Sequence, residues 1–200
     1  MPVTMPYPPE GPAQPPNRVR WTRDQCTLIQ DALILVGRYE LVDGEILSKM
    51  GQKPAHAYVI RAVMAWLIRI FGENAIQVQL PIHIVGDDAE YNEPEPDCAV
   101  LASPAKTFAD HHPGPSELHL VVEISDSSLG FDLNTKARLY GNAGIAEYWV
   151  VDILARRLVV FRNPGATGYA SIVAYSESEV CAALASPANT VLVSELLPPR

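Results

Sequence analysis

The apolar run at residues 118–124 is the feature that most constrains how this chain folds. A short run of branched apolar side chains that ends in a polar loop is typical of a strand buried on both faces of a sheet. Glu123 interrupts this run near its end, and a second buried strand is predicted at residues 98–101, directly after Pro96 and Asp97. The two acidic residues therefore stand at the ends of two core strands, 26 positions apart (123 − 97).

The length and composition favour one globular domain. The chain has 200 residues, of which 48% are hydrophobic, enough for a substantial core. We expect no membrane segment, because no apolar run approaches the ~20 residues that a spanning helix needs, and no secretion signal is recognisable. Cys26, Cys98 and Cys181 form no CxxC pair, which argues against a disulfide framework or a thiolate zinc site. Free thiols are typical of the reducing cytoplasm, so we expect a cytoplasmic protein.

Proline marks the first segment as separate from the domain. Residues 1–21 contain seven prolines and are predicted to form a flexible arm, with a single domain over residues 22–200. Arginines at the end of this arm are candidates for contact with phosphate, but a solvated tail is the favoured interpretation.

The charge distribution argues against tight non-specific binding of DNA. The net charge is −8, whereas phosphate contacts need a positive surface. Residues 87–97 carry six acidic side chains and no basic one. Over residues 131–162 five cations face three anions, so this segment predicts at most a modest basic surface.

The other predicted elements follow from capping residues, glycines and apolar periodicity. Asp43-Gly44 between alternating apolar residues predicts a hairpin over residues 39–47. Pro54 and Gly72 bracket a helix that ends near Phe71. The rest are a helix after Thr22 with an apolar face that includes Leu28, Leu33 and Ile34, a strand over 75–85, a helix capped by Asp132 that ends near 141–144, a hairpin of 147–152 with 157–161, and weaker edge strands at 169–173 and 182–193.

The acidic strand ends are the candidate functional site. Asp97 and Glu123 would meet at a sheet edge and hold a divalent cation, and Lys136, one loop and one helical turn later, would offset charge on a phosphate. Each of these residues also has a plain alternative as a turn or surface residue. Glu40 on the hairpin is equally well explained as a solvent-facing strand residue. His56, in the first turn of its helix, is more simply a capping or surface group.

Several motifs occur together in a fixed order. They are residues 94–97 (Pro-Glu-Pro-Asp), residues 121–129, the set Asp132, Lys136 and Tyr140, and residues 144–152, with further matches at residues 39–45, at His56 and at residues 79–82. With these motifs the chain closely resembles the Uma family of restriction-type endonucleases, within the PD-(D/E)XK nuclease superfamily, over roughly residues 22–198.

The resemblance implies a fold and a site. The fold is an α/β restriction-endonuclease-like core, a mixed central β-sheet flanked by α-helices, with additional hairpin strands. The site is Mg²⁺-dependent, with Mn²⁺ able to substitute, and Asp97 and Glu123 are its metal-binding carboxylates. Ser125 stands where the superfamily has its lysine, and members of this family supply the lysine from the following helix, which is Lys136 here. Glu40 and His56 match recurrent family positions.

These observations predict an endonuclease that hydrolyses phosphodiester bonds of DNA through a two-carboxylate Mg²⁺ site, with the Ile124 carbonyl as a candidate third ligand. The rival interpretation is a catalytically inactive nuclease-fold module for binding, which the acidic balance and Ser125 favour. A metallohydrolase of small phosphoesters is a third. Because cleavage of two strands suits a two-fold assembly, a homodimer is an open expectation.

Overall fold

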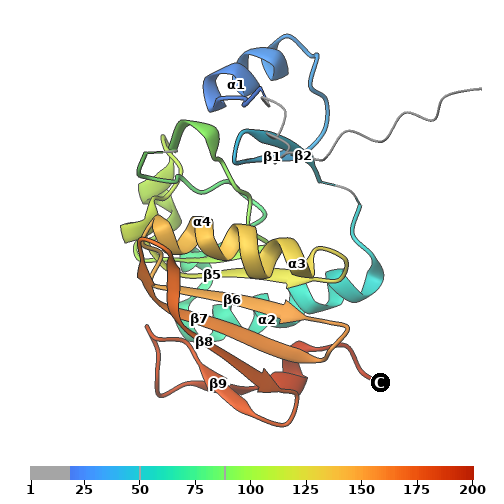
Figure 1. The fold of residues 1–200 in the computed structure, drawn as a ribbon. Helices are drawn as coiled ribbons and strands as arrows, with labels where there is room; N and C mark the ends of the chain where they lie inside the picture. Colours follow the sequence, from blue (N-terminus) through green and yellow to red (C-terminus); the bar gives the residue numbers. More distant parts are fainter. Residues whose placement is uncertain (1–18, 50, 88) are drawn as a thin grey trace, which may run out of the picture.

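A six-stranded mixed β-sheet forms the middle of the molecule (Figure 1). The computed structural model describes residues 19–49, 51–87 and 89–200, so most of the predicted N-terminal arm lies outside the described residues. The strand order is β3-β4-β5-β6-β7-β8; the β5–β6 pair is parallel and the other neighbouring pairs are antiparallel. The strands are β3 (Ile76–Val78), β4 (Cys98–Leu101), β5 (Leu118–Ser125), β6 (Glu147–Asp152), β7 (Arg157–Gly165) and β8 (Gly168–Ser176).

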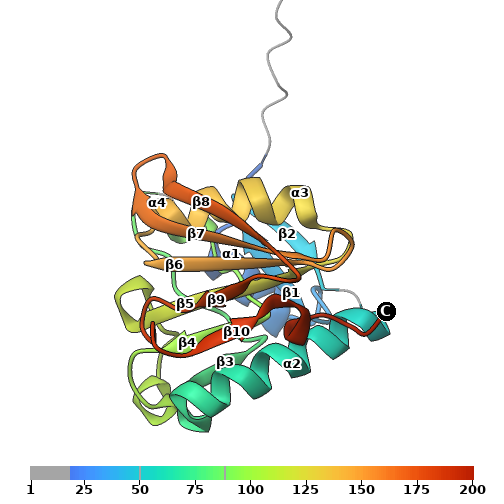
Figure 2. The same cartoon turned by 90° about the horizontal axis from the view of Figure 1, so that it is seen from below.

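Helices cover both faces of the sheet, as the two views in Figures 1 and 2 show. One face packs against α2 (Pro54–Phe71) and a small hairpin; the other packs against a continuous helical stretch. The hairpin is β9 (Val180–Ala182) with β10 (Thr190–Leu192), and the helical stretch is α3 (Leu129–Phe131), a π-helical segment (Asp132–Lys136) and α4 (Ala137–Asn142). This arrangement confirms the predicted mixed α/β core flanked by helices.

The strand predicted to be buried on both faces, β5, lies in the centre of the sheet. Val122 and Ile124 belong to the core on the α2 side, whereas Val121 belongs to the core on the α4 side. Burial of such a side chain contributes roughly 1.5–3 kcal/mol. Because side chains alternate along a strand, Glu123 and Ser125 share the face of Val121, toward the helix that follows β5.

The predicted hairpin is confirmed as β1 (Tyr39–Val42) and β2 (Glu45–Ser48). Its turn residues Asp43 and Gly44 have φ of 51° and 78°, the left-handed pair that a two-residue type I′ turn requires. The hairpin lies beside α1, above the main sheet in Figure 1.

Segment 91–95 fastens this hairpin to the sheet. Leu41 and Glu93 exchange backbone hydrogen bonds of 3.2 and 2.8 Å. The acidic segment 87–97 thus partly serves as the hairpin's backbone partner, which its composition did not predict.

Helix α1 (Arg23–Asp31) starts as predicted, with Thr22 and Gln25 forming a capping box.

Some predicted boundaries were wrong. The strand over 75–85 ends at Val78, because Gln79 has a φ of 50° and leaves the strand conformation. The helix after β5 begins at Leu129 rather than at Asp132, which lies inside it. The stretch 182–193 contains the last residue of β9, a loop and all of β10.

The apolar face predicted for the helix after Thr22, which also included Cys26 and Ile29, was wrong in part. In α1 itself Cys26 is buried, whereas Leu28 is 67% exposed. Leu33 and Ile34 lie beyond the helix and are 79% and 75% exposed. These apolar side chains therefore do not join either core.

Helix α2 corrects the expectation that no stretch reaches membrane-spanning length. It has 18 residues and a mean hydropathy of 1.2, so by length and composition alone it qualifies as a span. Its buried side chains instead pack on the sheet, with Trp66 stacked 5.5 Å from Trp149. One such helix is weak evidence for a membrane span, because the core helix of a globular protein passes the same test.

The three cysteines, Cys26, Cys98 and Cys181, are free and buried. Burial raises the pKa of each thiol, that of Cys181 to about 11. These thiols therefore carry little thiolate at neutral pH, and they act as small core side chains.

Candidate active site

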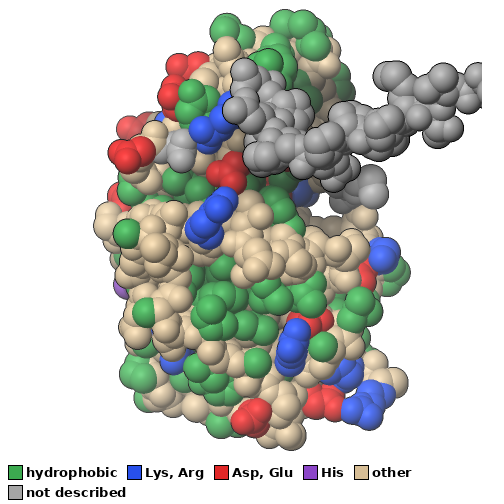
Figure 3. All heavy atoms as spheres, in the orientation of Figure 1, with side chains coloured by type: hydrophobic (Ala, Val, Ile, Leu, Met, Phe, Trp, Pro, Cys, Tyr) green, Lys and Arg blue, Asp and Glu red, His purple; other side chains and the backbone are tan. Residues whose placement is uncertain are grey.

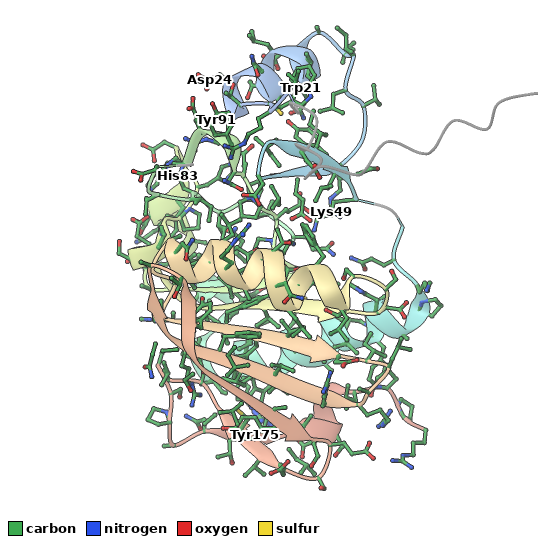
Figure 4. All side chains as sticks on the ribbon, in the orientation of Figure 1. Trp21, Asp24, Lys49, His83, Tyr91 and Tyr175 are labelled. Carbon is green, nitrogen blue, oxygen red and sulfur yellow. The ribbon has the colours of Figure 1, made fainter. Side chains whose placement is uncertain are left out.

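A cavity of about 290 Å³ opens between the β1–β2 hairpin, the N-terminal turn of α2 and the ends of β4 and β5. All of the candidate residues named from the sequence line it, together with Lys49. They are Glu40, His56, Asp97, Glu123, Ile124 and Lys136. Figure 4 labels Lys49, which lies between the hairpin and α3. Folding thus brings side chains from five separate segments into one place.

Asp97 enters the cavity directly before β4. Cys98 pairs with Val122, so continuing the antiparallel register by one residue sets Asp97 opposite Glu123. Its Oδ2 accepts a hydrogen bond of 2.9 Å from the Ile124 N–H. Burial opposes ionisation, but the hydrogen bond with His56 and the His56 charge hold the pKa of Asp97 below its ordinary value.

Glu123 and Lys136 form a buried ion pair, with 3% and 2% of each residue exposed. Lys136 Nζ donates to Glu123 Oε1 at 2.7 Å, and the Tyr140 hydroxyl donates to the same oxygen at 3.0 Å. Burial raises the pKa of Glu123, whereas the Lys136 ammonium opposes the rise and Asp97 adds to it. Although burial works against its charge, the carboxylates of Glu123 and Glu40 raise the pKa of Lys136, which stays protonated.

Glu40 lies inside the cavity and not on a solvent-facing side of its strand. It is 6% exposed, and its Oε2 lies 2.8 Å from Lys136 Nζ. The Glu95 N–H donates to the same oxygen at 3.1 Å, and Lys49 Nζ lies 3.3 Å from Oε1. Burial opposes its charge, but Lys136 and Lys49 hold the pKa of Glu40 below its ordinary value.

His56 points from the first turn of α2 at the carboxylates. Its Nε2 lies 3.2 Å from Asp97 Oδ1, and 18% of its side chain is exposed. Adjacent His111 and His112 are exposed in the loop after β4, where His111 contacts Asp110. They take no part in this cavity.

Several further lining residues were not assigned to the site from the sequence, among them Lys49, Gln79 and Asp132. Lys49 donates to the Glu95 carbonyl at 2.8 Å, and Gln79 donates to Asp97 Oδ1 at 3.3 Å. The position of Gln79 depends on its positive φ, for which the sequence carries no signal. Asp132 also lines the cavity. Tyr140 had a signal, its spacing of four from Lys136, which places both on one helical face.

The five cations of residues 131–162, which predict at most a modest basic surface, all have acidic partners. Each of the five cations is in an ion pair: Lys136 with Glu123, Arg138 with Asp43, Arg156 with Glu177, Arg157 with Asp152, and Arg162 with Glu147. On the face in Figure 3, basic side chains are scattered and interspersed with acidic ones. Electrostatic attraction of nucleic acid to this segment is therefore weak.

The oxygen donors of the cavity fit a hard divalent cation. Among the described residues no three His, Cys, Asp or Glu side chains cluster closely enough to hold a metal by themselves. Mg²⁺, however, is commonly held by one or two carboxylates and keeps several waters. Asp97 and Glu123 supply two carboxylates, and each disfavours the charge of the other. Ile124 lines the same cavity and is the candidate carbonyl ligand.

The mixed sheet, with carboxylates and a lysine gathered at the ends of its central strands, defines a nuclease-like α/β protein. The chain belongs to the Uma2 family, described as "Putative restriction endonuclease", whose model matches residues 33–193. This confirms the family inferred from the motifs.

A crystal structure supports the fold independently. It is that of "a putative nuclease belonging to DUF820" from Anabaena variabilis ATCC 29413, with a TM-score of 0.63 and 11% identity. The similarity covers 84% of this chain and 96% of that one. A comparison with curated proteins finds no match.

Proposed function

We propose that this protein is a Mg²⁺-dependent endonuclease that hydrolyses phosphodiester bonds of DNA. The family supports a nuclease that acts on nucleic acid. One observation carries the proposal for this chain: the Lys136 amine lies 2.7 Å from Glu123 and 2.8 Å from Glu40, in the cavity that Asp97 also lines. Two carboxylates beside one protonated amine suit a reaction in which negative charge develops on phosphate oxygens.

In this proposal Asp97 and Glu123 hold the metal, with the Ile124 carbonyl as a further ligand. When bound, Mg²⁺ would polarise the phosphate and lower the pKa of a bound water. Lys136 stabilises negative charge on the phosphate and orients the attacking water. Glu40 keeps Lys136 protonated, and His56 orients the Asp97 carboxylate through its hydrogen bond.

The experiment is cleavage of plasmid and oligonucleotide DNA by the purified chain in Mg²⁺, Mn²⁺ or EDTA. We expect cleavage with either metal and none in EDTA. Asp97→Asn, Glu123→Gln and Lys136→Ala should each lower the rate at least about 100-fold. Asp110→Asn is the matched control, because this carboxylate lies in an exposed loop outside the cavity. Equal rates for Asp97→Asn and Asp110→Asn would refute the assignment.

The rival is a binding module that keeps the fold without turnover, which the paired cations favour. A metal titration followed by thermal unfolding tests whether the carboxylates bind metal, and no metal response would favour the rival. If Mg²⁺ or Mn²⁺ raises the unfolding midpoint of the wild type, but not of Asp97→Asn, the carboxylates bind metal. Metal binding without cleavage of DNA, RNA or small phosphodiesters would establish the rival.

A further inference from the structure

Ser125 occupies a buried position close to the proposed catalytic residues. It lies two residues after Glu123 on the same face of β5 and is 1% exposed. Its hydroxyl donates a hydrogen bond of 2.6 Å to Asp132 Oδ2. The side chain is too short to bring charge to the cavity, but it links the strand to the helix that carries Lys136.

Asp132 is the other end of this link. It is 3% exposed and lies at the start of the π-helical segment Asp132–Lys136. The Ser128 hydroxyl also donates to its Oδ2, at 2.5 Å, and the Tyr148 hydroxyl donates to its backbone carbonyl at 3.1 Å. Side chain and backbone of this residue are therefore tied to β5, to the preceding loop and to β6.

On the side of the helix that faces β5, polar side chains recur every four residues and form a row. Asp132, Lys136 and Tyr140 are buried, whereas Asn134 and Arg138 between them are exposed. The row contacts two residues of one strand: Asp132 meets Ser125, while Lys136 and Tyr140 meet Glu123. A π-helical turn holds more residues than an α-helical turn and is often found at functional sites, so the rotation of Lys136 depends on how this segment is held.

We infer that Ser125 and Asp132 are positioning residues that fix the helix against β5 and thereby hold the Lys136 amine at Glu123. The inference rests on the proposed function for its catalytic consequence. A lysine side chain has four rotatable bonds, and misplacement of a catalytic group by about 1 Å can cost about 100-fold in rate. This Ser125–Asp132 tether lies one helical turn before Lys136. It constrains the helix backbone there, while the amine itself is held by its contacts with the carboxylates.

The test compares Ser125→Ala with Ser128→Ala. Both variants remove one hydroxyl donor from the same carboxylate oxygen, but only the first cuts the connection between β5 and the helix. We expect Ser125→Ala to lower kcat at least about 10-fold with KM within twofold, and Ser128→Ala to lower kcat less than threefold. Equal losses of kcat in the two variants, or a loss confined to KM, would overturn the inference.

Two substitutions of Asp132 test whether this residue acts as a tether or through its charge, as a metal ligand would. Asp132→Asn keeps an oxygen that accepts from both serines, whereas Asp132→Ala keeps none. As a tether, Asp132→Asn retains at least a third of the wild-type kcat while Asp132→Ala loses at least about 10-fold. If both variants lose activity equally, Asp132 acts by its charge and the inference is wrong.

A readout without turnover separates this inference from the proposed function. A buried, ion-paired ammonium group exchanges its protons slowly, so Lys136 should give an amine signal in ¹⁵N-lysine-labelled protein, assigned by its loss in Lys136→Met. We expect the signal to move or vanish in Ser125→Ala and to stay in Ser128→Ala. An unchanged signal in Ser125→Ala would refute the tether. If the amine signal changes in Ser125→Ala and stays in Ser128→Ala, but the protein cuts no substrate, the positioning role is supported and only the proposed nuclease function is refuted.

Discussion

At the scale of single residues, the site is a small set of charges held almost out of water. Glu40, Glu123 and Lys136 are each at most 6% exposed, and the amine contacts both carboxylates. Ion pairs in such surroundings add little net stability, but removal of one member leaves an uncompensated buried charge. Lys136 is therefore the residue on which the folding of this cluster depends most.

Lys136→Met should lower the free energy of unfolding by about 3 kcal/mol at pH 7, because two buried carboxylates lose their common cation. Urea unfolding followed by circular dichroism measures the change. Lys49→Met is the control: its side chain is 22% exposed, and we expect a loss of at most about 1 kcal/mol. Adding Glu40→Gln to Lys136→Met should restore part of the loss. A loss below 1 kcal/mol for Lys136→Met would contradict this account.

The sequence was informative about some of these residues and silent on others. Asp97 and Glu123 were named because an acidic residue at the end of an apolar strand stands out from its surroundings. For Glu40 the sequence left two interpretations in balance, because its burial depends on where the hairpin docks. Lys49 and Gln79 reach the cavity through that docking and through a positive φ, and neither is a local property of the sequence.

At the scale of elements, the helix over the site packs unusually close to an edge strand. A Cβ added to Gly141 in α4 would lie 2.6 Å from the Gly168 carbonyl carbon in β8. No side chain fits there, because the obstacle is backbone. A Cβ added to Gly130 in α3 would meet nothing within 4 Å. The two glycines of one helical stretch thus have opposite roles.

Gly130→Ala should stabilise the protein by roughly 0.5–1 kcal/mol, the usual gain of alanine over glycine in a helix. Gly141→Ala should destabilise it by about 1–3 kcal/mol, because α4 must move off β8. Thermal and urea unfolding of both variants provide the comparison. A stabilising Gly141→Ala would mean that the helix and strand separate at little cost.

Element types were predicted better than their limits. The hairpin, α2, β4 and β5 have strong local signals in turn residues, caps and apolar runs, and they lie as predicted. The strand at 75–85 was overextended, because branched residues such as Ile82 are buried there without a partner strand. Asp132 is of a residue type that often caps helices, but hydrogen bonds from Ser125 and Ser128 hold it inside the helix.

At the scale of the whole molecule, the charges are mostly balanced by neighbours. Besides the buried Lys136, the cations near the cavity are Arg38, Lys49 and Lys53, and each of them contacts a carboxylate: Glu95, Glu40 and Asp126 respectively. Phosphate must therefore compete with protein carboxylates for these groups. The net charge of −8 adds a general repulsion.

Binding of a DNA duplex should consequently be weak and only mildly salt-dependent. We expect log K to fall against log salt with a slope of about −3 or shallower, since at most these three cations replace counterions. Fluorescence anisotropy in EDTA measures this without cleavage. Lys53→Ala, whose side chain is 68% exposed, should flatten the slope by about 1. A slope steeper than about −6 would reveal a basic surface that this arrangement lacks.

The outer edge of β8 predicts self-association. The strand pairs only with β7 in the described sheet, has no charged residue, and exposes Ile172 (61%) and Val173 (44%) near its middle. An edge without charge, proline or bulge is a template for another strand. We expect the mass from light scattering to rise with concentration and Ile172→Lys to abolish this. Leu154→Lys, at an exposed turn, is the control, and a concentration-independent monomer would contradict the prediction.

The amine at Glu123 is supplied by a helix and not by the strand that carries Glu123, which affects how such a site can be recognised from sequence. Positions 125 and 136 lie on different elements, and here the side chain at 125 is a serine that contacts Asp132, while the amine at Glu123 comes from Lys136 on the helix. A motif that requires a lysine two residues after the acid therefore misses this chain, although its family model matches and its fold resembles that of a nuclease-like structure at 11% identity.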